Sequence, residues 1–179
     1  QHNFLVSQPD FNFHNPEVRK WLLSNVRFWL ERGVDGFRLD TVNYYFHDQQ
    51  LRNNPPRKEA VEHPPVNPYY MQDHVHSISQ PENIDFVEDL RALLDEFGAA
   101  AMVGEISILD LMAEYTAGSN RLHLAYSFEL LGPIFSAQHV RKCIENFFNI
   151  AQKGIPCWSF SNHDVIRHVS RWASLASTP

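Results

Sequence analysis

The sequence predicts an α/β fold in which parallel β-strands alternate with helices. Short apolar segments rich in strand formers recur along the chain, and amphipathic segments of about 10 to 16 residues with helical periodicity separate them. Glycine follows the expected helices at positions 33, 98 and 154. Strands that alternate with helices in this way usually pair in parallel through right-handed crossovers, so we expect helices to cover the sheet.

The first helix is expected to begin at Pro16 and to stop before Gly33. Asn15 is a favourable N-cap, proline suits the first helical position, and apolar residues follow at helical spacing. Residues 34–40 have the composition of a short buried strand. Residues 47–83 are polar and rich in Pro, Asn and His, which predicts a long loop after this strand.

The same alternation continues to the end of the chain. The expected order is helix 84–97, strand 99–106, short helix 109–115, strand 122–129, helix 137–152, strand 155–161 and helix 163–174. Periodicity alone leaves two architectures open. The strands could form an open, doubly wound sheet, or they could be part of a (β/α)8 barrel.

Composition limits the class of protein. The 179 residues suit a single domain, and no apolar run approaches the 18 residues of a membrane span. The net charge of −6, with dispersed Lys and Arg, gives no electrostatic basis for binding nucleic acid or an anionic membrane. Cys143 and Cys157 allow at most one disulfide, which favours a reducing, cytoplasmic location.

Three carboxylates fall at or after the carboxyl ends of expected strands: Asp40, Glu105 and Asp164. Parallel α/β folds place their active sites at this edge. Arg38 precedes Asp40 by two residues and therefore shares its face of the strand, where its charge favours the ionised carboxylate. Glu105 follows the apolar run 99–104, so we expect apolar surroundings that favour its protonated form.

An ionised and a protonated carboxyl group side by side form the machinery of a retaining glycoside hydrolase. Each residue also has a simpler explanation. Asp40 could cap the following loop, Glu105 could form a structural salt bridge, His163 could occupy a turn, and Tyr44 could be a packing residue. Chance alone does not readily place three carboxylates, an arginine and a histidine at strand ends.

Four segments resemble glycoside hydrolase family 13, the α-amylase superfamily, and within it the bacterial α-glucosidases. They are QPDFN at residues 8–12, GFRLD at 36–40, VGE at 103–105 and FSNHD at 160–164. Their order and spacing agree with the family. The resemblance implies that residues 1–179 are the central, incomplete part of a catalytic (β/α)8 TIM barrel, from about strand four to strand seven with their helices.

The resemblance also implies a role for residues in these motifs. Asp40 corresponds to the nucleophile, Glu105 to the general acid/base and Asp164 to the transition-state stabiliser. Arg38 and His163 correspond to residues that bind substrate.

Three further residues are candidates for substrate contacts. Thr41 follows the nucleophile, at a position associated with linkage preference in the family, and is neither the valine usual in α-1,6-acting enzymes nor the common alanine. Tyr44 belongs to the segment that most resembles the bacterial α-glucosidases. Phe128 is expected either on the acceptor side of the site or in the core.

The resemblance further implies what lies outside this chain. The family's strand-three segment, whose aspartate and histidine contact substrate, has no counterpart here, and four strands are expected where a closed barrel has eight. We therefore expect the remainder of the barrel to be a partner of this chain. The isolated chain is expected to be inactive. No cofactor is expected, and no metal site is assigned, because the family's usual calcium or magnesium ligands lie largely in the missing part.

The expected function is a retaining α-glucosidase of the bacterial cytoplasm. It would hydrolyse, or transfer, α-linked glucose from short oligosaccharides such as maltose or sucrose, and the loop at 47–83 would limit the pocket to such substrates. One alternative is a trehalose synthase or another transglucosidase or isomerase of the same family. Another is a non-catalytic scaffold or transporter-associated subunit, although such relatives usually lose the catalytic carboxylates.

Overall fold

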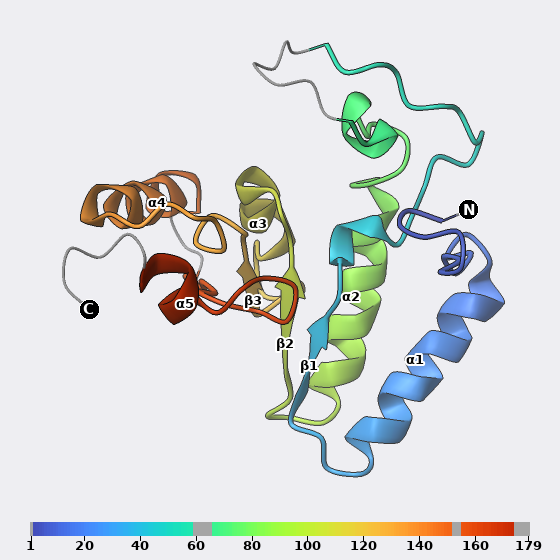
Figure 1. Cartoon of the computed structure of the whole chain (residues 1–179). Helices are drawn as coiled ribbons and strands as arrows, with labels where there is room; N and C mark the ends of the chain where they lie inside the picture. Colours follow the sequence, from blue (N-terminus) through green and yellow to red (C-terminus); the bar gives the residue numbers. More distant parts are fainter. Residues whose placement is uncertain (1, 59–65, 152–154, 174–179) are drawn as a thin grey trace.

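A three-stranded parallel sheet with helices packed around it forms the centre of the protein (Figure 1). The computed structural model describes residues 2–58, 66–151 and 155–173. The strands β1 (Gly36–Leu39), β2 (Ala101–Glu105) and β3 (Leu124–Tyr126) lie side by side in chain order. The helices of the described residues are α1 (Pro16–Leu30), η1 (Val42–Tyr44), η2 (Pro68–Met71), α2 (Glu82–Asp95), α3 (Leu109–Tyr115), α4 (Ala137–Ile150) and α5 (His168–Ala173).

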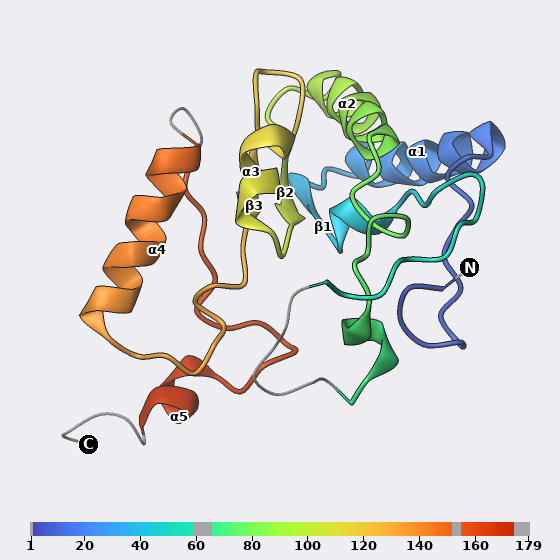
Figure 2. The same cartoon turned by 90° about the horizontal axis from the view of Figure 1, so that it is seen from above.

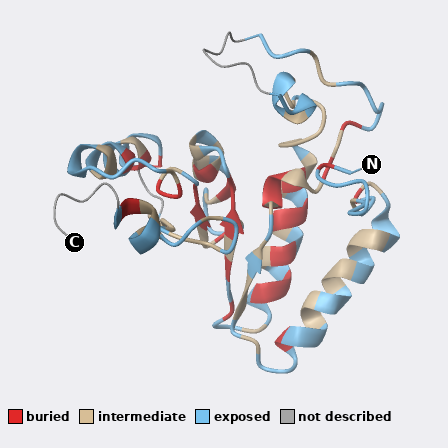
Figure 3. Cartoon of the chain, in the orientation of Figure 1, coloured by how far each residue is buried: buried red, intermediate tan, exposed pale blue. Residues whose placement is uncertain are grey.

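Helices α1 and α2 lie next to each other beside β1 (Figure 2). The start of α1 follows the sequence prediction, because Asn15 Oδ1 accepts a hydrogen bond of 3.0 Å from the Glu17 N–H and proline occupies the first turn. Phe37 and Leu39 of β1 pack against the core that these helices build. Figure 3 shows the buried residues concentrated on α2, β2 and β3.

The expected strand at 155–161 is wrong. In this segment only one residue pairs with the sheet, through an isolated parallel bridge between Trp158 and Ser127. A proline at position 156 cannot donate a ladder hydrogen bond, which weakens pairing beside it. The helix expected from His163 begins at His168, after a turn, and its expected last residue, 174, lies outside the described residues.

The described parts of the long loop after β1 are held together by their own polar side chains. Asp48 and Arg52 form an ion pair of 2.6 Å, and the Asn54 amide donates to Ser77 Oγ at 3.0 Å. The 3₁₀ helix η2 lies within this segment, which the sequence predicted as a long loop. The loop contacts η1 through Tyr69 and Tyr44, whose hydroxyl oxygens are 3.3 Å apart.

Two glycines allow the central strands and their surroundings to approach closely. A Cβ atom at Gly36 would overlap the carbonyl oxygen of Ala101 on β2. A Cβ atom at Gly104 would lie 2.5 Å from Leu122 Cδ1 and 3.0 Å from Val42 Cγ1. The first contact involves backbone, which cannot rotate away, so glycine at position 36 is required by the spacing of β1 and β2.

Replacement of this glycine should therefore destabilise the sheet. We expect Gly36→Ala to lower the free energy of unfolding by about 3 kcal/mol, because the two strands must separate to admit the methyl group. Gly132→Ala is the control, since a Cβ atom there meets only the Glu129 carbonyl oxygen at 4.0 Å. Urea unfolding followed by tryptophan fluorescence measures both, and equal stability of the two variants would contradict the prediction.

Candidate active site

Strand register brings three polar side chains into one row at the carboxyl edge of the sheet. Leu39 of β1 pairs with Gly104 of β2, so Asp40 follows at the level of Glu105. Glu105 in turn pairs with Tyr126 at the end of β3. Neighbouring strands are about 4.8 Å apart, so residues at the same level are direct neighbours.

Glu105 is buried, with 4% of its surface exposed, but its surroundings are polar. Its Oε1 forms an ion pair of 2.7 Å with Arg38 Nη2 and accepts a hydrogen bond of 3.0 Å from the Tyr126 hydroxyl. Its Oε2 accepts a hydrogen bond of 3.1 Å from the Thr41 backbone N–H. The expectation of apolar surroundings is therefore wrong, because donors from β1, β3 and the turn after β1 converge on this carboxylate.

Arg38 connects the two carboxylates. Its guanidinium contacts Asp40 through Nη1, and its Nη2 contacts both Glu105 and the Tyr126 hydroxyl, the latter at 2.9 Å. Burial alone would lower the pKa of Arg38, but the hydrogen bonds to Tyr126 and Asp40 and the charge of Glu105 outweigh it and raise that pKa. Arg38 therefore stays positively charged between the two acids.

The chain turns sharply directly after Asp40. Thr41 has a left-handed backbone conformation, with φ of 39° and ψ of 51°. A β-branched residue adopts this conformation only under strain. The turn directs the Thr41 N–H to Glu105, so the strained residue provides one of the three contacts that hold the buried carboxylate.

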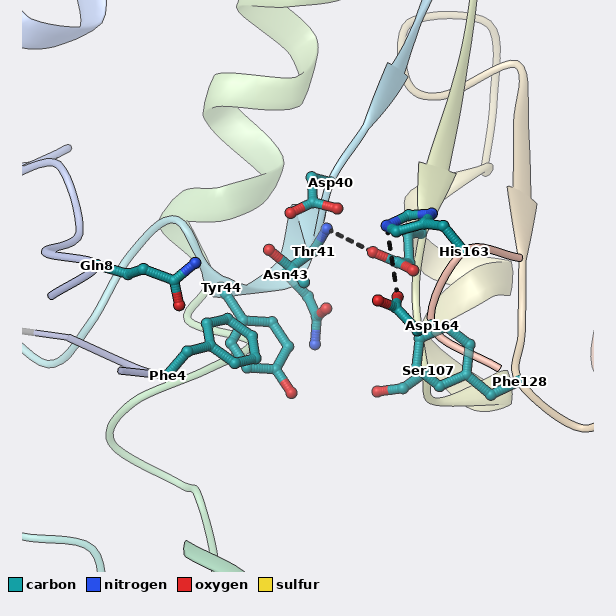
Figure 4. Close-up of a pocket in the computed structure, with 11 residues that line it drawn as sticks. Phe4, Gln8, Asp40, Thr41, Asn43, Tyr44, Ser107, Phe128, His163 and Asp164 are labelled. Carbon is teal, nitrogen blue, oxygen red and sulfur yellow. Dashed lines mark hydrogen bonds and ion pairs between the residues drawn. The ribbon is translucent and has the colours of Figure 1, made fainter. Parts of the chain in front are cut away.

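A cavity of about 370 Å³ opens at this edge of the sheet (Figure 4). Asp40 and Tyr44 lie on one wall, and His163 and Asp164 lie on the other. The complete lining consists of Phe4, Gln8, Asp40, Thr41, Asn43, Tyr44, Glu105, Ser107, Phe128, His163 and Asp164. The structure therefore brings together every residue that the sequence proposed for the site, with Arg38 contacting two of the lining carboxylates.

The turn after the unformed fourth strand supplies two of these side chains. His163 Nε2 and Asp164 Oδ2 are 3.6 Å apart, and their side chains are 74% and 65% exposed. Asp40 is also largely exposed, at 71%. One buried carboxylate and two accessible ones thus face a common cavity.

Sequence reasoning missed five residues of the site as functional candidates. Gln8 lies in the QPDFN segment, Ser107 follows Glu105 by two residues, and Tyr126 lies within the expected strand 122–129, so their positions carried a signal. Phe4 stacks on Tyr44 with ring centroids 5.5 Å apart, within a segment that has no recognisable pattern. Asn43 is completely buried, and its amide donates to Ser79 Oγ.

The described ranges contain neither a cluster of metal-ligating side chains nor a membrane-spanning helix. Among these residues, no group of three or more His, Cys, Asp or Glu side chains is placed to hold a metal ion. No helix in the described part of the chain combines the length and apolar character needed to cross a membrane. Cys143 and Cys157 are both free, and burial raises the pKa of each thiol.

These observations define a class of protein. It has a parallel β/α sheet, and acidic side chains surround a cavity at the carboxyl ends of the strands. Comparison with known proteins narrows this class. The chain belongs to the α-amylase family, glycoside hydrolase family 13, because the family described as "Alpha amylase, catalytic domain" matches residues 1–178. The fold class of that domain is the (β/α)8 barrel, and the three parallel strands are consistent with a part of it.

Individual relatives support the same assignment. The chain is 51% identical over 181 residues to a probable α-glucosidase of Rhizobium meliloti (strain 1021), covering 96% of this chain and 33% of that protein. Identity to Maltase A1 of Drosophila melanogaster is 30% over 189 residues, with coverage of 96% and 33%. The crystal structure of the α-glucosyl transfer enzyme XgtA matches with a TM-score of 0.89 at 51% identity, covering 99% of this chain and 34% of that one. The chain spans about a third of the length of these relatives.

The contact between Arg38 and Glu105 predicts a coupling that stability measurements can detect. We expect Arg38→Met to cost about 3 kcal/mol, because Glu105 is left buried without its cation. The same change in a Glu105→Gln background should cost about 1 kcal/mol, since no buried charge remains. Urea unfolding of the four proteins of this cycle tests the coupling, and equal costs in both backgrounds would refute it.

Proposed function

We propose that this chain carries the catalytic carboxylates of a retaining α-glucosidase. The observation that supports the proposal is the position of Asp40 and Glu105 at the same level of two adjacent parallel strands, with one arginine contacting both. Two carboxyl groups that flank a scissile glycosidic bond at short separation are the requirement of the retaining mechanism. The relative of Rhizobium meliloti, named a probable α-glucosidase, supports the substrate class.

In the first step, the exposed Asp40 is the nucleophile. One of its oxygens forms a bond to the anomeric carbon while the glycosidic bond breaks, and the leaving oxygen takes that electron pair together with a proton from Glu105. The products are a covalent glucosyl-aspartate and the released aglycone. Arg38 contacts Asp40 through Nη1 and orients its carboxylate in the free enzyme.

In the second step, Glu105 is the base. It takes a proton from an incoming water or sugar hydroxyl, whose oxygen bonds to the anomeric carbon, and Asp40 leaves with the electron pair of the ester bond. Asp164 and His163 lie on the opposite wall of the cavity, and we assign them contacts with the sugar that strengthen as the ring distorts. Asp164 thereby stabilises the transition state.

The cavity walls define the proposed substrate. Thr41 lies next to the nucleophile and is the proposed determinant of linkage preference, while Tyr44 and Phe128 supply aromatic surface for sugar rings. A cavity of about 370 Å³ suits one or two sugar units, such as maltose or sucrose. The contact between Tyr44 and Tyr69 places the long loop at the edge of this cavity, which supports a restriction to short oligosaccharides.

Transfer of glucose to another sugar is the second candidate function. The relative XgtA, named an α-glucosyl transfer enzyme, shares 51% identity with this chain, which specifically favours it. Both reactions share the first step and differ in the acceptor that attacks the intermediate. Analysis of the products from maltose distinguishes them, because transfer yields trisaccharides or new disaccharides whereas hydrolysis yields glucose alone.

We further propose that the site becomes complete when the remaining barrel strands pack against this chain. Within the described residues β1 pairs with β2 alone, so its other edge is open for a further strand. The proposed cytoplasmic location rests on the two free cysteines.

The nucleophile is tested by trapping. Incubation of the full-length protein that carries this chain with a 5-fluorinated α-glucosyl fluoride should label Asp40, because the electron-poor sugar forms the ester faster than it hydrolyses. Peptide mass mapping locates the adduct. Asp40→Asn should reduce turnover of maltose by roughly 10³-fold or more.

Asp35→Asn is the matched control, since this exposed aspartate lies before the amino end of the same strand. It should retain turnover and labelling. Labelling of another residue, or near-normal turnover by Asp40→Asn, would disprove the assignment of the nucleophile.

Substrate length tests the proposed role of the loop at 47–83. We expect kcat/KM to be highest for maltose or sucrose and to fall by at least about tenfold for long maltooligosaccharides, because Tyr69 brings the described part of the loop against Tyr44 of the cavity wall, where we propose that it restricts the acceptor side. Initial rates on a series of increasing chain length give this comparison. Efficient cleavage of starch would rule out the restriction.

A further inference from the structure

Tyr126 lies next to Glu105, the proposed acid/base, and belongs to none of the four sequence motifs. It is the last residue of β3, pairs in register with Glu105, and is 8% exposed. Its hydroxyl lies 3.0 Å from Glu105 Oε1 and 2.9 Å from Arg38 Nη2. Strand pairing fixes its backbone, since the Ile106 N–H donates to the Tyr126 carbonyl at 3.2 Å.

The direction of these hydrogen bonds follows from chemistry. A guanidinium has only donors, so the hydroxyl oxygen accepts from Arg38 and its single proton is donated to Glu105. Burial raises the pKa of Tyr126 above its ordinary value, although the hydrogen bond from Arg38 opposes the shift. The phenol therefore remains protonated, and remains a donor, throughout the neutral pH range.

The two oxygens of Glu105 consequently differ. Oε1 receives Arg38 Nη2 and the Tyr126 hydroxyl, which occupy its two lone-pair sites. Oε2 receives the Thr41 N–H and, within the described residues, no second hydrogen bond. A proton carried by Glu105 is accommodated on Oε2, where a lone pair is left for it.

We propose that Tyr126 is a positioning residue that, together with Arg38, fixes Oε1 and leaves Oε2 as the proton-carrying oxygen of the acid/base. The inference rests on the proposed function. In the first step the proton passes from Oε2 to the leaving oxygen as the glycosidic bond breaks, and in the second step Oε2 takes a proton from the attacking hydroxyl. Without the tyrosine hydroxyl, Oε1 keeps one donor, and the carboxyl group can rotate away from this orientation.

The test compares two substrates in Tyr126→Phe, which removes only the hydroxyl. Maltose needs a proton for its leaving oxygen, whereas α-glucosyl fluoride releases fluoride and needs little acid assistance. In the full-length protein we expect kcat/KM for maltose to fall by about 10- to 100-fold and kcat/KM for the fluoride by less than about threefold. Activity on the fluoride also reports that the variant is folded.

Tyr115→Phe is the matched control, because Tyr115 is a buried tyrosine on α3 that does not line the cavity. It should retain the wild-type ratio of the two rates. Equal losses on both substrates in Tyr126→Phe would indicate a merely structural role, and unchanged rates on both would indicate none, so either result overturns the proposal. If the wild-type protein cleaves neither substrate, the proposed function fails and this inference fails with it.

Discussion

The site depends on the register of three short parallel strands. A shift of β2 by one residue would turn Glu105 to the opposite face of the sheet and separate it from Arg38, Asp40 and Tyr126. Gly36 allows the backbones of β1 and β2 to approach at one end, and Arg38 joins the carboxylates at the other. Backbone geometry and side-chain charge therefore specify the same alignment.

Burial explains why Arg38 has a central place in this arrangement. Glu105 is withdrawn from water and would be unfavourable there as an isolated charge, whereas Asp40 remains accessible. One guanidinium contacts both groups and also fixes the tyrosine hydroxyl. The two carboxylates thereby have different environments although they lie at the same level of the sheet, which suits their proposed division into nucleophile and acid/base.

Much of the fold and the site followed from the sequence, because both depend on local patterns. The Asn15 cap, the alternation in β1 and the motifs around Asp40 and Glu105 all act over a few residues. The failures concern interactions between distant segments. Whether residues 155–161 form a strand depends on a neighbour in the sheet, and the polar contacts of Glu105 come from β1 and β3, which its own apolar segment does not reveal.

The turn at Thr41 separates what the main chain contributes from what the side chain contributes. Its contribution to Glu105 comes from the main-chain N–H, which every amino acid except proline possesses, while its side chain borders the cavity. The side chain can thus be exchanged without deleting the hydrogen bond. Glycine or asparagine would even relieve the left-handed strain. A substitution at this position can therefore change the surface of the cavity while the main-chain contact that holds the buried carboxylate stays in place.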